Sequence, residues 1–130
     1  MRLDRRDLLV SAVAALLNST HPGRADTFPA RPLTLIVSLA AGSSVDVILR
    51  ALVTGAERRL GQPIVVENRP GAGTTLAPAQ MAATAKPDGY TICQLGVPVL
   101  RAPALRKTTY DPSTDFTYII GVVQLVFGLV

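Results

Sequence analysis

Residues 63–77 read PIVVENRPGAGTTLA, in which an apolar run, a glycine-rich loop and a helix-prone segment follow one another directly. The run PIVVE (63–67) is short, apolar and β-branched, as in a buried strand. The loop NRPGAG follows, and the alanine-rich TTLAPAQMAATA (74–85) is predicted to be a helix. Proline is tolerated in a helix only in the first turn, so Pro78 indicates that this helix begins near Thr75.

The preceding segment has the same order of elements. PLTLIVSLA (32–40) predicts a buried strand, and the apolar spacing from Ser44 onward predicts a helix. Ser43 and Asp46 form an S-x-x-D capping pattern at its start, and Gly61 is a natural stop. The apolar face of this helix is expected to comprise Val45, Ile48, Leu49, Leu52, Val53, Ala56 and Leu60.

A third strand, YTICQL (90–95), completes the order strand–helix–strand–helix–strand. Such βαβαβ units form parallel sheets with helices on both faces, so the sequence predicts an α/β fold. Ligands of these sheets bind at the carboxyl ends of the strands. Three segments are expected there, of which the first two open helices: AAGSSVD (40–46), NRPGAGTT (68–75) and LGVPV (95–99).

The chain is predicted to end in a loop and a further buried strand. TTYDPSTDF (108–116) has the composition of a loop. The closing run TYIIGVVQLVFGLV (117–130) is too short for a membrane span and is β-branched, which favours a buried strand or pair of strands.

The N-terminus has the layout of an export signal. A charged MRLDRR precedes the apolar run Leu8–Leu17, and small residues follow at Gly23 and Ala25. Ten apolar residues are too few to span a bilayer. The Arg5–Arg6 pair also fits a twin-arginine signal, so Sec and twin-arginine export both remain open. We expect residues 1–25 to be removed near Ala25 and the protein to be periplasmic.

The composition argues against an enzyme and against a nucleic-acid partner. The net charge of the 130-residue chain is +4, its basic residues are scattered, and part of that charge lies in the leader. The only histidine, His21, also lies in the leader, so the mature part cannot form a Ser-His-Asp triad or a histidine zinc site. Cys93 is the only cysteine, which excludes an intramolecular disulfide. We expect no catalytic residue, no metal and no cofactor.

The two loops that open helices could hold an anion. A helix N-terminus exposes unpaired N–H groups, and glycine lets an anion approach the backbone closely. Ser43, Ser44, Thr74 and Thr75 would add hydroxyl donors. The alternative is that Ser43 and one threonine are helix caps and the glycines only form turns.

A dinucleotide site is a second alternative. Gly71, Gly73 and Ala77 match G-x-G-x-x-A, but NRP separates the strand from the first glycine, whereas the fingerprint turn follows its strand directly. The acid expected about 20 residues further on would be Asp88, which lies in a turn before the next strand. A P-loop motif is absent from the sequence.

The chain resembles the Bug-type receptors, the extracytoplasmic solute-binding proteins of tripartite tricarboxylate transporters. The segments that carry the resemblance occur in the family's order and spacing from about Phe28 onward: RPLTLIVSLAAGSSVDVILR, LGQPIVVENRPGAGTTLA, KPDGYTI and YDPSTDF. The resemblance implies a two-domain, type II-like periplasmic binding protein that closes on a small carboxylate and delivers it to the permease subunits of a membrane transporter.

The resemblance also implies which residues hold the carboxylate. Backbone N–H groups and hydroxyls would do so, from Gly42, Ser43, Ser44 and Asp46, from Gly71, Ala72, Gly73, Thr74 and Thr75, and from Gly96. The first loop departs from the family's usual PGGSTD, and the third loop lacks the usual hydroxyls.

Family members are about twice as long as a single domain. We therefore expect residues 26–130 to be a partial domain that supplies the first lobe, with weak ligand binding or none. A nucleotide-binding lobe of an enzyme and a non-functional truncated gene product remain as alternatives.

Overall fold

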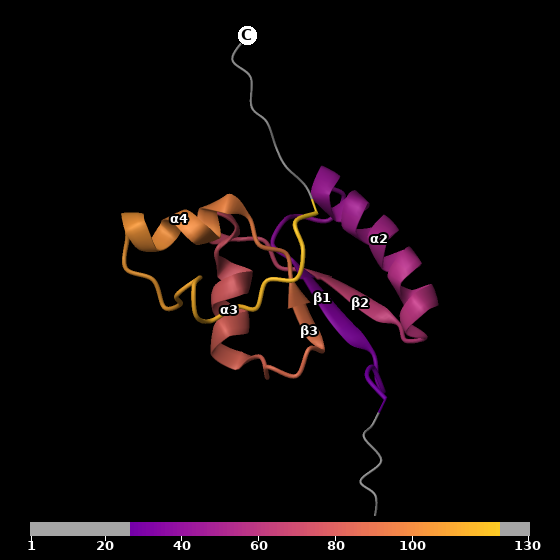
Figure 1. Cartoon of the computed structure of the whole chain (residues 1–130). Helices are drawn as coiled ribbons and strands as arrows, with labels where there is room; N and C mark the ends of the chain where they lie inside the picture. The colour runs from indigo at the N-terminus through magenta and orange to yellow at the C-terminus, as the bar shows by residue number, and fades with distance from the viewer. Residues whose placement is uncertain (1–26, 123–130) are drawn as a thin grey trace, which may run out of the picture.

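A computed structural model of the chain describes residues 27–122 (Figure 1). In order, the elements are β1 (Leu33–Val37), α2 (Ser44–Leu60), β2 (Ile64–Asn68), the 3-10 turn η1 (Ala72–Thr74), α3 (Leu76–Thr84), β3 (Thr91–Cys93) and α4 (Val97–Leu105). The predicted export signal over residues 1–25 lies outside the described residues, as do the last eight residues of the closing run.

The three strands form one parallel sheet in the order β2-β1-β3, which confirms the predicted βαβαβ arrangement. The central strand β1 alternates its side chains, with Leu33, Leu35 and Val37 on one face and Thr34 and Ile36 on the other. Because the sheet is parallel, all three strands end at the same edge, where the loops predicted to bind a ligand lie.

Helix α2 covers one face of the sheet. Leu49 and Val53 pack against Leu35 and Val37 in a buried core. The predicted apolar face was too wide, because Ile48 and Leu52 remain 43% and 51% exposed. The contact with the sheet is made by a stripe with the spacing i, i+4, centred on Leu49 and Val53, and the neighbouring apolar positions turn away from it.

Helices α3 and α4 lie together on the side of the sheet opposite α2 (Figure 1). Their shared core contains Val99 of α4 and the rings of Tyr110 and Phe116, which meet edge to face with centroids 5.9 Å apart. The loop after α4 thus returns to α3 and α4 and packs Tyr110 and Phe116 against them. Pro78 lies in the first turn of α3, as predicted.

Helix α4 was not predicted, so the expectation that only two of the three loops open helices was wrong. The sequence obscures this helix because Pro103 lies inside it and cannot donate to the carbonyl of Val99, four residues earlier. The hydroxyl of Tyr110 donates to that carbonyl instead, at 3.1 Å. A residue outside the helix therefore supplies the hydrogen bond that proline removes.

The described part of the closing run, residues 117–122, forms no strand, which contradicts the predicted buried strand there. Tyr118, Ile119, Ile120 and Val122 are all at least 45% exposed. A strand needs a neighbour for its backbone N–H and C=O groups, and within residues 27–122 this run pairs with neither edge of the sheet.

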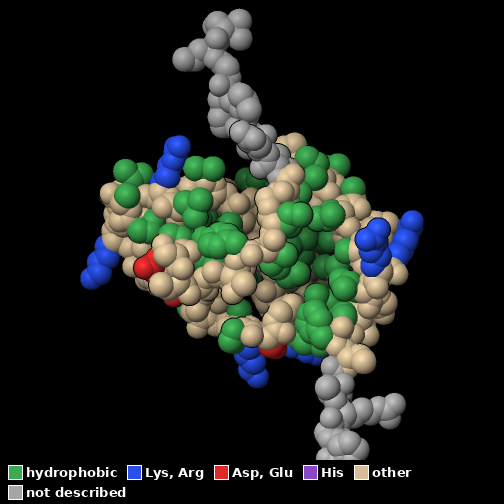
Figure 2. All heavy atoms as spheres, viewed as in Figure 1, with side chains coloured by type: hydrophobic (Ala, Val, Ile, Leu, Met, Phe, Trp, Pro, Cys, Tyr) green, Lys and Arg blue, Asp and Glu red, His purple; other side chains and the backbone are tan. Residues whose placement is uncertain are grey.

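Apolar side chains are also exposed elsewhere on the described surface. On the face seen in Figure 2 they gather on the side of α4 and beside the closing segment. Leu100 and Leu105 of α4 are 53% and 82% exposed. Among the helices of residues 27–122, none combines the length and apolar character needed to cross a membrane.

Candidate functional site

Three loops meet at the carboxyl edge of the sheet: the first loop (38–43), the second loop (69–75) and the third loop (94–96). The hydroxyl of Ser38 donates to the carbonyl of Gln94 at 2.8 Å, which ties the first loop to the third. The N–H of Arg69 donates to the carbonyl of Val37 at 2.8 Å, which ties the second loop to β1. The three loops therefore form one connected surface.

The first loop ends in a helix cap. Ser43 is the N-cap of α2, and its hydroxyl accepts from the N–H of Asp46 at 3.3 Å, which confirms the predicted cap. Gly42 has a φ of 80° and donates its N–H to the carboxylate of Asp46 at 2.9 Å. Within residues 27–122 the N–H groups of Ser44 and Val45 have no acceptor, so they are the donors this loop can offer to a ligand.

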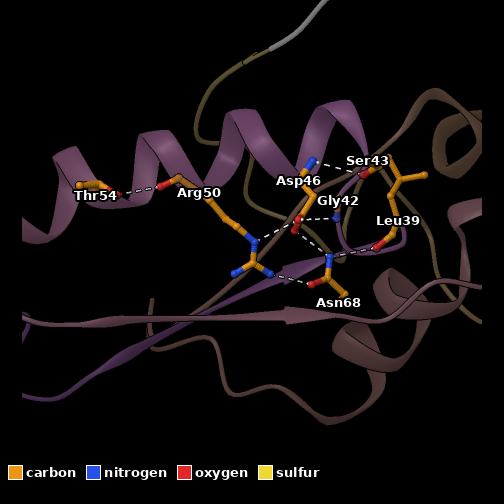
Figure 3. Close-up of polar contacts among 7 residues, drawn as sticks. All are labelled: Leu39, Gly42, Ser43, Asp46, Arg50, Thr54 and Asn68. Atoms are coloured by element: carbon orange, nitrogen blue, oxygen red, sulfur yellow. Dashed lines mark hydrogen bonds and ion pairs between the residues drawn. The ribbon is translucent and has the colours of Figure 1, made fainter.

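Asp46 is buried, with only 2% of its surface exposed, and both oxygens of its carboxylate accept hydrogen bonds from other groups of the protein (Figure 3). It accepts from Arg50 Nε at 3.0 Å and from Asn68 Nδ2 at 2.8 Å, in addition to Gly42. The hydrogen bond from Arg50, followed by those from Asn68 and Gly42, lowers the pKa of Asp46 from 3.8 to about 2. Asp46 thus orders the first loop, and its direct contact with a ligand stays a prediction.

The second loop has an uncommon backbone conformation. Ala72, Gly73 and Thr74 are three successive residues with left-handed φ values of 48°, 63° and 71°. Successive peptide groups in such a turn direct their N–H groups to one side and form an anion-binding concavity. Within residues 27–122, the N–H groups of Gly71, Ala72 and Gly73, which precede the first internal hydrogen bond of this 3-10 turn, have no acceptor. Non-glycine residues in this region cost about 1–3 kcal/mol each and cluster at functional sites.

The hydroxyl of Thr74 is the most informative atom of the loop edge. Its Oγ1 is buried and has no hydrogen-bond partner within the described part of the chain. Most buried polar atoms in proteins are paired, and an unpaired one calls for an explanation. A Cβ placed on Gly96 would lie 3.1 Å from this oxygen. Gly96, the N-cap of α4, therefore allows the third loop to approach the second loop closely at Thr74.

Thr75 has a different role from Thr74. It occupies the N-cap position of α3, but its side chain makes no capping hydrogen bond, and neither does that of Thr74, so the predicted cap by one of the two threonines was wrong. Its Oγ1 donates to the carbonyl of Ala72 at 2.7 Å and accepts from Arg106 Nη2 at 3.0 Å. Arg106 brings a positive charge to the second loop. The sequence could not indicate it, because α4, which it follows, was not predicted.

This arrangement suits an anion better than a metal or a dinucleotide. Helices α2, α3 and α4 all begin at this edge, where their N-terminal dipoles add to the unpaired N–H groups. The described residues contain no cluster of three potential metal-ligating side chains. Asp88 precedes β3 and pairs with Arg31 at 3.0 Å, at the opposite edge of the sheet. It cannot act as the ribose-binding acid of a fingerprint at Gly71.

The loop edge is an open surface. A cavity of about 230 Å³ lies elsewhere, on the face of the sheet beside α3. Its lining mixes Thr34 and Ile36 of β1 with Met81 and Thr84 of α3. None of the predicted site residues lines it, so the donors described above do not belong to this cavity.

The chain matches the family model described as "Tripartite tricarboxylate transporter family receptor" over residues 48–130. It is 45% identical over 124 residues to the UPF0065 protein in the gbd 5′ region of Cupriavidus necator. That match covers 94% of this chain and 38% of the relative, so the chain spans well under half of the relative's length.

Two solved structures share the fold. The periplasmic binding protein BugD is 40% identical, with a TM-score of 0.63, over 68% of this chain and 30% of that one. MatC from Rhodopseudomonas palustris, solved with bound malate, is 37% identical, with a TM-score of 0.62, over 69% of this chain and 31% of that one.

Proposed function

The chain belongs to the tripartite tricarboxylate transporter receptor family, and on that premise we propose that it captures a small carboxylate outside the cytoplasm for a membrane transporter. In this proposal the loop edge of the sheet is the binding surface. The ligand's carboxylate accepts from the N–H groups of residues 71–73 and from those of Ser44 and Val45. Gly96 lets the third loop pack closely against Thr74 beside them.

The observation that carries the proposal is the hydroxyl of Thr74, which has no partner among residues 27–122. A buried hydroxyl without a partner costs about 1–3 kcal/mol, and a ligand oxygen would supply the missing partner. The left-handed turn at residues 72–74 places backbone donors around the same position. Arg106 adds positive charge through its hydrogen bond to Thr75, which favours an anion over a neutral ligand.

Malate is the natural probe, because MatC was solved with malate bound. We propose that the permease subunits of a tripartite transporter are the protein partners and that the protein is periplasmic, with residues 1–25 removed near Ala25. The loop edge of the described residues is open to water, so we expect weak affinity, with Kd about 1 mM or higher.

Thr74→Val tests the proposal. Valine keeps the shape of threonine but has no hydroxyl, so we expect malate affinity to fall about threefold to tenfold. Stability should stay the same or rise, since the substitution removes an unpaired buried polar atom. Malate binding is followed by calorimetry or by NMR titration, and stability by urea unfolding.

The matched control is Thr84→Val. Thr84 is exposed at the far end of α3, and its hydroxyl donates to the carbonyl of Gln80 at 2.8 Å. Malate affinity of this variant should equal that of the unchanged chain. If Thr74→Val bound malate as well as the control does, the assignment of this hydroxyl to the ligand would be wrong.

A further inference from the structure

A closed ring of hydrogen bonds lies beneath the first loop (Figure 3). Arg50 Nε donates to Asp46 Oδ2 at 3.0 Å, and Arg50 Nη2 donates to Asn68 Oδ1 at 2.9 Å. Asn68 Nδ2 donates to Asp46 Oδ1 at 2.8 Å and closes the ring. The three side chains come from two turns of α2 and from the last residue of β2, so the ring joins elements that are distant in the sequence.

The ring is attached to the first loop at two points. Asp46 Oδ2 accepts the N–H of Gly42 at 2.9 Å, and Asn68 Nδ2 donates to the carbonyl of Leu39 at 3.1 Å. The second loop begins at the next residue, Arg69, whose N–H is bonded to Val37. One side chain, Asn68, therefore stands between the two loops and holds the backbone of the first.

Each member of the ring depends on the others. The amide of Asn68 uses its nitrogen for two acceptors and its oxygen for Arg50, which fixes its orientation. Asp46 is buried and receives three donors. Removing the side chain of Asn68 leaves Oδ1 of the buried Asp46 without its donor, and such a loss costs more than an exposed hydrogen bond is worth.

We propose that Asp46, Arg50 and Asn68 are positioning residues that hold the first loop in a fixed orientation to the second loop before a carboxylate arrives. They act through the backbone of Gly42 and Leu39 instead of contacting the ligand, so this proposal replaces the direct contact that the family resemblance implies for Asp46. A preorganised loop loses less conformational freedom on binding, so the ring increases affinity without adding a contact. This inference rests on the proposed function of the loop edge, and it names the side chains that keep that edge in place.

Two substitutions of Asn68 test the proposal in the full chain. Asn68→Ala removes the side chain that links the loops. Asn68→Asp keeps its shape but replaces the donor by an acceptor facing Asp46. In both we expect the amide of Gly42, which lies 26 positions away in the sequence, to exchange its hydrogen about tenfold faster or more. Malate affinity should fall about threefold to tenfold.

Glu67→Gln is the matched control. Glu67 is the preceding residue of β2, points to the opposite face of the sheet, and pairs with Arg69 in an exposed salt bridge. This variant should leave both the exchange of Gly42 and the affinity for malate unchanged. Backbone amide spectra of all three variants report whether the fold is retained, and Asn68→Asp serves if Asn68→Ala does not fold.

The exchange rate and the affinity separate this proposal from the proposed function. Unchanged exchange of Gly42 in a folded Asn68 variant would overturn the positioning role. Faster exchange with undiminished malate affinity would also overturn it, because the ring would then order the loop without serving binding. If the unchanged chain bound no malate, the proposed function would fail, while the exchange of Gly42 would still decide whether the ring holds the loop.

Discussion

Replacing Gly71 by asparagine is expected to destabilise the protein by about 1–3 kcal/mol and to abolish measurable malate binding. Gly71 has φ 148° and ψ 160°, a region that is essentially restricted to glycine. A Cβ there would also lie 2.7 Å from Leu76 Cδ2, at the start of α3. Leu76 can rotate to relieve the contact, but no rotation relieves the backbone strain. The second loop must therefore change its path, and the donors of residues 71–73 are displaced.

Gly73→Asn is the matched substitution two residues further on. Gly73 has φ 63° and ψ 42°, which asparagine adopts more readily than most residues, and nothing lies within 4 Å of its added Cβ. We expect a loss of stability below about 1 kcal/mol for this variant. Urea unfolding and malate titration of both variants provide the comparison. Equal effects at the two glycines would refute the described conformation of the second loop.

Replacing Asp46 by asparagine is expected to lower the thermal midpoint by several degrees at neutral pH. The carboxylate receives donors from Gly42, Arg50 and Asn68. Asparagine offers one acceptor oxygen, and its NH₂ would face a donor on the other side. Every orientation of the new side chain therefore leaves at least one of these three donors unsatisfied.

The same substitution should change the response to acid. The pKa of Asp46 is lowered from 3.8 to about 2, so its ionised form is favoured in the folded state. Its contribution to stability is present above about pH 4 and is lost as the pH falls toward 2. The difference in stability between the unchanged chain and Asp46→Asn should therefore shrink over this range. Urea unfolding at pH 5, 3 and 2 measures it.

Asp88→Asn is the control for this acid response. Asp88 forms an exposed pair with Arg31 at the other edge of the sheet, and such pairs contribute at most about 1 kcal/mol. The difference in stability between the unchanged chain and Asp88→Asn should be nearly the same at pH 5 and at pH 2. A difference for Asp46→Asn that stays constant from pH 5 to pH 2 would contradict the described environment of the carboxylate.

The sequence predicted those parts of the fold that local patterns determine. The apolar run before Ser38 and the capping pattern at Ser43 placed β1 and α2, and the φ of 66° at Gly61 confirms the stop. The sequence could not predict α4, because this helix contains Pro103. The hydrogen bond that Pro103 cannot donate is supplied by Tyr110, which lies outside the helix. The width of the buried stripe on α2 was likewise set by tertiary packing, which leaves Ile48 exposed.

The sequence predicted where the residues of the candidate site lie better than it predicted what each residue does. The glycines and hydroxyls of both loops do lie at the edge where the strands end. The sequence did not reveal that the hydroxyl of Thr75 is bonded to Arg106, while that of Thr74 has no partner in the described part of the chain. No local pattern pointed to Asn68, which the structure places in the ring with Asp46 and Arg50. These distinctions depend on contacts between distant segments, which no local pattern encodes.

The most direct test of the account is a titration of the ¹⁵N-labelled chain with sodium malate, compared with sodium chloride at the same ionic strength. Malate should shift the backbone amides of Ser44, Val45 and residues 71–74 in a saturable manner, beyond the effect of chloride. Thr74→Val should weaken these shifts. Shifts no larger than those from chloride, or shifts confined to the cavity beside Thr34, would contradict the claim that the loop edge binds a carboxylate.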